Sequence, residues 1–232
     1  MSGPLDGIRI VDLSVAITGP LAAGMLVDQG ADCVKVEQAP TGDVVRWLGS
    51  TVAGISAMFQ AANRGKRSIV LDLRQADGLA ILRDLVADAD VLVQNFRPGV
   101  AERLGVAYED IRSIRPDIVY ADLTGFGTSG PYSHRRVYDT VIQAQSGLAA
   151  SQTGLNDDQP KFLKQLVCDK VTAYTACQAI TAALFARSRG AGGQHLELSM
   201  LDACIAFLFV DGAEHEVILE GDYSGPQSVA AN

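Results

Sequence analysis

The sequence predicts an open α/β fold, in which a mostly parallel β-sheet is covered by helices. Two observations lead to this prediction. Short hydrophobic segments alternate with segments of helical spacing from residue 8 to residue 123, which is typical of successive strand–helix units. Hydrophobic residues also make up 48% of the 232 residues and charged residues 20%, a composition that can build a packed core.

The strands are expected where short β-prone segments are bounded by turn residues, at residues 8–15, 31–37, 67–73, 91–96, 118–123 and 195–199. Segment 75–87 has the spacing of an amphipathic helix, with Leu79, Leu82, Leu85 and Val86 on one face. The other helices are expected at residues 19–29, 108–114, 137–148, 170–187 and 201–219. Ligands of open α/β folds bind beyond the carboxyl ends of the strands, so the loops there are the first place to look for function.

Composition excludes several classes of protein. The formal net charge is −8 and no basic stripe is visible, so a nucleic-acid partner is not expected. The first residues lack the pattern of a secretory signal, and apolar runs such as residues 205–210 are too short to cross a membrane. The cysteines show neither a C-x-x-C pair nor metal-ligand spacing: Cys33, Cys168, Cys177 and Cys204. We interpret them as buried free thiols of a cytoplasmic protein, and we expect no metal site.

Two polar segments are candidates for ligand contacts, and the second lies at the carboxyl end of an expected strand, where ligand loops belong. Lys66 and Arg67 stand at a turn before the third expected strand, where they either face solvent or meet phosphates. Asn95, Phe96 and Arg97 follow the fourth expected strand, with Arg103 shortly after them. An aromatic ring, an amide and two guanidinium groups in such a place could hold an adenine and phosphates.

Asp169 directly precedes the helix expected at residues 170–187. Aspartate is a favoured N-cap residue, and a carboxylate is stabilised at a helix N-terminus. The same setting keeps the carboxylate ionised, as a carboxylate nucleophile requires, so the two interpretations are compatible. The adjacent Cys168 is interpreted as a packed thiol, because no histidine or cluster of cations is near it in the sequence.

Taken in order, these segments resemble the family III (CaiB/BaiF-type) CoA-transferases. The matching stretches cover nearly the whole chain: PLDGIRIVDLS, GPLAAGMLVDQGADCVKVEQAPTGD, NRGKRSIVLDL, VLVQNFRPGVAERLG, TGFGTSGPY, YDTVIQAQSGL, Asp169 before its helix, and GAGGQHLELSMLDA. The resemblance implies a Rossmann-like CoA-binding domain over residues 1–200, and an exit helix and linker over residues 201–232 that lead towards a small domain. Family members are longer, so the C-terminal part of the family fold is expected to be absent from this sequence.

The resemblance also implies a reaction. CoA would move from an acyl-CoA to a carboxylic acid through a mixed anhydride and a CoA thioester formed on Asp169, with acyl-CoA as substrate and no permanently bound cofactor. The residues that match the family's CoA contacts are Lys66, Arg67, Asn95, Phe96, Arg97, Arg103, Val137, Tyr138 and Asp139. Relatives form interlocked homodimers, so the implied partner is a second copy of the chain or a complementary C-terminal chain.

Three positions separate this sequence from particular branches of the family. Ile17 and Gln38 stand where some formyl-CoA transferases carry Gln and Arg, which argues against that narrow specificity. Tyr138 stands where the racemase branch carries a histidine base, and a free tyrosine titrates near pH 10. An acyl-CoA racemase or isomerase therefore remains the weaker alternative. The short chain leaves a second alternative open, a non-catalytic CoA-binding subunit of a split enzyme, and the chain alone is expected to be incomplete as an enzyme.

Overall fold

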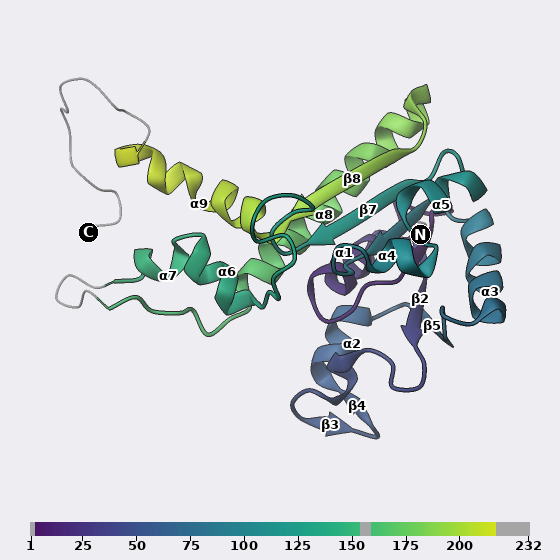
Figure 1. Ribbon diagram of the computed structural model, residues 1–232, viewed down its shortest axis with the longest axis horizontal. Coiled ribbons are helices and arrows are strands. Elements are labelled where there is room, and N and C mark those ends of the chain that lie inside the picture. The colour runs from purple at the N-terminus through teal and green to yellow at the C-terminus, as the bar shows by residue number, and fades with distance from the viewer. Residues whose placement is uncertain (1–2, 154–158, 217–232) are drawn as a thin grey trace.

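The computed structural model describes residues 3–153 and 159–216 and is built on one six-stranded sheet (Figure 1). Every pair of neighbouring strands in this sheet is parallel, in the order β5-β2-β1-β6-β7-β8. The strands are β1 (Arg9–Asp12), β2 (Asp32–Gln38), β5 (Arg67–Leu71), β6 (Val91–Gln94), β7 (Val119–Thr124) and β8 (Gln194–Ser199). The open, parallel α/β fold expected from the sequence is therefore confirmed.

The strand order places a topological switch point between β1 and β6. From β1 the chain builds outwards through β2 to β5, and from β6 it builds in the opposite direction through β7 to β8. The loops that follow β1 and β6 therefore diverge to opposite faces of the sheet and leave a crevice between them.

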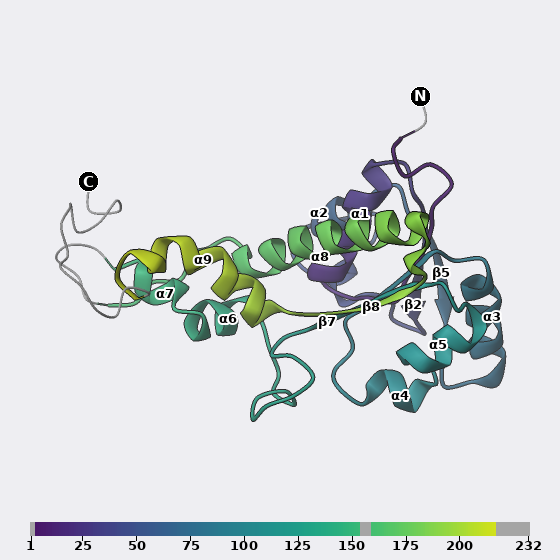
Figure 2. The same cartoon turned by 90° about the horizontal axis from the view of Figure 1, so that it is seen from above.

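Helices cover both faces of the sheet (Figure 2). One face is covered by α1 (Thr18–Asp28) and α8 (Val167–Ala186), and the opposite face by α3 (Ala76–Ala87) and α5 (Tyr108–Ile114). Small side chains such as Ala22, Ala23, Ala173 and Ala176 lie in the first core, which lets α1 and α8 pack closely together and against the strands. Leu82, Val86 and Ile111 fill the second core.

A third hydrophobic cluster extends the molecule beyond the carboxyl ends of the strands (Figure 1). It is formed by α6 (Asp139–Gln145), α7 (Leu148–Ser151), the first turn of α8 and α9 (Met200–Glu216). Residues 137–148 were expected to form one helix, but Gly147 adopts φ +86° between α6 and α7, a conformation that an α-helix cannot continue through. The last three residues of the helix expected at 201–219, and the linker after it, lie outside the described residues.

Five short elements between β2 and β7 were not predicted from the sequence. They are the 3₁₀ helix η1 (Val44–Trp47), the hairpin of β3 (Thr51–Val52) and β4 (Ile55–Ser56), α2 (Ala57–Asn63) and α4 (Val100–Leu104). Each is too short to show a helical or strand period of its own. All four cysteines are buried free thiols, as expected, and no helix in the described part of the chain is long and apolar enough to span a membrane.

Candidate active site

A pocket of about 730 Å³ opens at the topological switch point. Its walls come from the loops after β1, β6 and β7, from η1, and from the starts of α6, α8 and α9. Seven of the catalytic and CoA-contact residues predicted from the sequence line it: Asn95, Phe96, Arg97, Val137, Tyr138, Asp139 and Asp169.

Asp169 is the third residue of α8, which begins at Val167, and Leu166 is the N-cap residue. The expectation that Asp169 precedes the helix as its N-cap is therefore wrong. The physical reason is a capping group from elsewhere in the fold, because Asp139 Oδ2 accepts the N–H of Asp169 at 3.0 Å. With that amide satisfied from outside, the helix extends further towards its N-terminus and no local side chain caps it.

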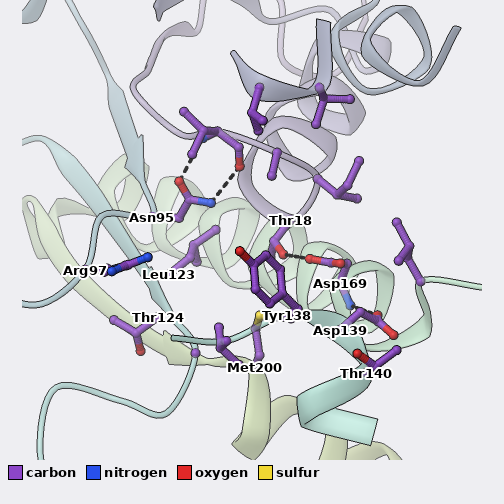
Figure 3. Close-up of a pocket in the computed structure, with 18 of the residues that line it drawn as sticks. Thr18, Asn95, Arg97, Leu123, Thr124, Tyr138, Asp139, Thr140, Asp169 and Met200 are labelled. Atoms are coloured by element: carbon purple, nitrogen blue, oxygen red, sulfur yellow. Dashed lines mark hydrogen bonds between the residues drawn. The ribbon is translucent and has the colours of Figure 1, made fainter. Parts of the chain in front are cut away.

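Thr18 holds the carboxylate of Asp169 in place. Its Oγ1 donates a hydrogen bond to Asp169 Oδ1 at 2.5 Å (Figure 3). Thr18 is the first residue of α1 and is buried, so the N-terminus of one helix meets the N-terminus of another at this bond. Thr18 was not predicted from the sequence, because 151 residues separate it from Asp169 and nothing in the local sequence distinguishes it from a helix-starting threonine.

The pKa of Asp169 is raised above its ordinary value. Burial has the largest effect, and the negative charge of Asp139 acts in the same direction. The hydrogen bond from Thr18 and the positive charge of Lys170 oppose this shift. The local sequence predicts only the favourable field of the helix N-terminus, which burial outweighs in the folded protein. A carboxylate with a raised pKa is a stronger nucleophile in its ionised form.

The start of α6 contributes residues with different roles. Asp139 is buried, and its other oxygen accepts a hydrogen bond from Gln143 Nε2 at 2.5 Å. Gln143 in turn bonds the backbone of Leu163 and Gln165, in the segment that leads into α8. Asp139 is thus committed to protein partners, whereas Tyr138 is 70% exposed at the mouth of the pocket.

The loop after β6 lies opposite the loop after β1. The amide of Asn95 accepts a hydrogen bond from the N–H of Val15 and donates one to its carbonyl oxygen, each at 2.8 Å (Figure 3). The side chain of Arg97 is exposed beside them. A second cavity of about 260 Å³ adjoins the pocket, shares Val15 and Phe96 with it, and is bordered by Arg74.

The remaining three basic residues predicted from the sequence do not line either cavity. Lys66 is almost fully buried, and its ammonium group donates to Asp12 Oδ2, the Pro20 carbonyl and Asn63 Oδ1 at 2.7–2.9 Å. An ammonium group has three donors, so this arrangement leaves none for a phosphate.

Arg67 forms an exposed ion pair with Asp32 at the start of β5. Arg103 lies exposed in the last turn of α4, next to Gly99.

One group of side chains outside the pocket has the chemistry of metal ligands. Asp122 on β7 and His195 and Glu197 on β8 each offer a ligand atom, and these atoms lie within 4.8 Å of one another. His195 stacks on Tyr108 with ring centroids 4.5 Å apart. His195 and Glu197 are exposed, and exposed acidic groups are common without a bound ion. This group could not be predicted from the local sequence, because its residues become neighbours only when β7 pairs with β8.

The fold and the pocket define a class of protein: a doubly wound α/β protein with a partly buried aspartate at the switch point, where open α/β enzymes bind their ligands. The comparisons with known proteins give the family. The family model described as CoA-transferase family III matches residues 5–230, and the chain belongs to that family.

The relatives include an acetyl-CoA:oxalate CoA-transferase of Acetobacter aceti, 40% identical over 210 residues, which are 89% of this chain and 53% of the relative. A succinate–glutarate CoA-transferase of Agrobacterium fabrum is 40% identical over 88% of this chain and 53% of its own length. A CaiB/BaiF family protein from Brucella suis matches with a TM-score of 0.89 and 36% identity, over 96% of this chain and 60% of that one. The chain thus spans about half the length of the curated relatives it matches.

Proposed function

We propose that this chain carries the catalytic aspartate of a CoA-transferase, and that Asp169 is the nucleophile. The observation that supports this most directly is the geometry of Asp169, which lines the pocket at the switch point with one oxygen bonded to Thr18. Thr18 fixes Oδ1, so Oδ2 is the oxygen left to attack. The named relatives transfer CoA between acids, which agrees with a nucleophilic carboxylate.

In the proposed reaction, the Asp169 carboxylate attacks the thioester carbonyl of an acyl-CoA and expels CoA thiolate, forming a mixed anhydride. The thiolate then attacks the aspartyl carbonyl, which releases the donor acid and leaves an aspartyl-CoA thioester. The acceptor carboxylate attacks this thioester and expels CoA thiolate, forming a second mixed anhydride. Finally, the thiolate attacks the acceptor's acyl carbon, so that the new acyl-CoA leaves and the Asp169 carboxylate is regenerated.

The surrounding helix termini supply electrostatic support for this sequence. α1 and α8 both begin at the pocket, and Asp169 is the one acidic residue in their first turns. No side chain caps α1, whereas in α8 the N–H of Asp169 is already bonded to Asp139. The partial positive charge of a helix N-terminus favours negative charge developing nearby. We therefore expect the first-turn amides of these helices to help stabilise the oxyanions of the tetrahedral intermediates.

The two adjoining cavities suggest how an acyl-CoA would lie. The thioester would sit near Asp169, and the nucleotide end would extend past Phe96 into the second cavity, beside Arg74. Arg97, Arg135 and Lys164 also line the main pocket and provide positive charge for phosphate or carboxylate groups. Because two relatives are named for oxalate and glutarate, we propose a small dicarboxylic acid as the acceptor.

We further propose that the protein acts in the cytoplasm, which agrees with its four buried free thiols. As partner we propose a second copy of the chain or a complementary C-terminal chain, because the relatives are about twice as long.

The deciding experiment is to trap the enzyme-bound thioester in the whole protein. The protein is incubated with a panel of acyl-CoAs and quenched with hydroxylamine, which converts an aspartyl thioester into a hydroxamate that peptide mass spectrometry can locate. We expect the label on Asp169 and none in Asp169→Asn, which should also lose turnover. Asp77→Asn is the matched control, because Asp77 lies in the first turn of α3 outside both cavities. Near-normal turnover of Asp169→Asn would refute the proposal.

A further inference from the structure

Resting on the proposed function, we infer that Asn95 and Asp43 are positioning residues for Asp169. They act through residues 15–17, which we call the strap. The strap leaves β1, lines the pocket and runs directly into α1, whose first residue is Thr18. Its conformation therefore decides where the hydroxyl group that holds Asp169 is placed.

The strap contains a strained residue. Ala16 adopts φ +66°, in the left-handed region that a residue with a Cβ atom rarely enters. Such a conformation persists only where the surrounding structure enforces it. The direction in which α1 begins depends on this turn, because Ile17 is the N-cap residue and its carbonyl oxygen accepts the N–H of Leu21 at 2.8 Å.

Side chains from other elements fix the backbone on the N-terminal side of Ile17. Lys35 on β2 donates to the carbonyl oxygen of Ser14 at 2.7 Å. Asn95, after β6, pairs with both backbone groups of Val15 at 2.8 Å. Asp43 Oδ1 accepts the N–H of Ala16 at 3.1 Å. Three consecutive residues are thus held by three separate parts of the fold.

Asp43 is itself held firmly. It is buried, its Oδ2 lies 3.1 Å from Lys35 Nζ, and its backbone N–H donates to Glu37 Oε2 at 2.9 Å. Arg46 then fixes Glu37 through two hydrogen bonds of 2.6 Å. Buried ion pairs contribute little net stability once their desolvation is counted, but a partly broken one is costly. The location of these ion pairs suggests a positioning role, because the network connects to the strap through the bond from Ala16 to Asp43.

Asn95 therefore has a different role from the CoA contact that the sequence suggested. One donor and one acceptor of its amide are used by Val15. A displacement of about 1 Å at a reacting group can lower a rate by about 100-fold. Removing Asn95 should therefore slow the acylation of Asp169 and leave the affinity for CoA nearly unchanged.

The experiment compares Asn95→Ala and Asp43→Ala, each alone and combined with Ala16→Gly, in the whole protein. Glycine adopts a positive φ without the steric penalty of a Cβ atom. Ala16→Gly should therefore remove the backbone strain at residue 16, so that the strap depends less on Asn95 and Asp43 to keep its conformation. Ala53→Gly is the matched control. Ala53 has φ +51° in the exposed turn between β3 and β4 and lines neither cavity, so the same relief there should restore nothing.

We expect each alanine variant to form the Asp169 adduct roughly 10- to 100-fold more slowly at saturating acyl-CoA. Calorimetry should show a Kd for CoA within about twofold of the wild-type value, because a positioning residue makes no ligand contact of its own. Adding Ala16→Gly should raise the adduct-formation rate of each alanine variant by at least about threefold, since glycine has no steric penalty at positive φ. Urea unfolding of every variant checks that it is folded. If an alanine variant does not fold, Asn95→Asp replaces it, because the aspartate still accepts the N–H of Val15 but offers no donor to its carbonyl oxygen.

Two results would overturn the inference. One is weaker CoA binding with an unchanged rate at saturation, which would make Asn95 a ligand contact. The other is a slowed variant that Ala16→Gly fails to improve. Both differ from failure of the proposed function itself, which would appear as turnover by Asp169→Asn whatever the strap variants do.

Discussion

The hydrogen bond from Thr18 to Asp169 gives the sharpest prediction. Thr18→Val removes the hydroxyl group and keeps the branched shape, so the buried start of α1 stays packed. Hydrogen bonds to charged groups contribute about 1.5–3 kcal/mol. If this bond orients the nucleophile in the transition state, its loss should lower kcat/KM by roughly 10- to 150-fold. Thr18→Ser retains the hydroxyl group and should stay within about threefold of wild type.

The dependence on pH separates an orienting role from a merely structural one. The bond from Thr18 lowers the pKa of Asp169 against the larger opposing effect of burial. Thr18→Val should therefore raise that pKa further, and the acidic limb of the kcat/KM profile should move to higher pH. The assay is acyl transfer followed across about pH 5–8, where proteins tend to be most stable. A Thr18→Val enzyme with wild-type kcat/KM and an unmoved acidic limb would refute this reasoning.

Two further predictions concern stability. Burial opposes the ionisation of Glu37, but its bonds from Arg46, Ser68 and the backbone of Asp43 outweigh it and lower the pKa from 4.5 to about 2. This contribution to the free energy of unfolding, at most about 3 kcal/mol, is present above the unfolded-state pKa and is lost as pH falls from about 4.5 to about 2. In Glu37→Gln, urea unfolding measured across this pH range should no longer show the loss, and a wild-type decrease in stability would contradict the prediction. Tyr120→Phe should lower the free energy of unfolding by about 1 kcal/mol, because the buried hydroxyl group donates to the Val106 carbonyl at 2.9 Å; equal urea midpoints for the two proteins would count against that bond.

The alternation of strand-like and helix-like segments in the sequence predicted most of the sheet and its main helices. The expected helix at 108–114 coincides with α5, and the five expected strands up to residue 124 all occur, with boundaries that differ by a few residues. Strands and long helices carry their periodicity locally, so it can be read without knowing the fold. The sequence motifs also identified the family, which the family model confirms over residues 5–230.

Tertiary structure alone decided how the site is assembled. Thr18 meets Asp169 across 151 residues, and Asn95 meets Val15 across 80, because the carboxyl ends of parallel strands gather loops from distant parts of the chain. No local pattern records such pairings. The same cause explains why Lys66, predicted from the sequence to face either solvent or a phosphate, donates instead to three acceptors within the protein. The sequence by itself determined the family and predicted candidate site residues. The fold decided which of these candidates face the pocket and which are bonded to other side chains, because hydrogen-bond partners are set by spatial proximity.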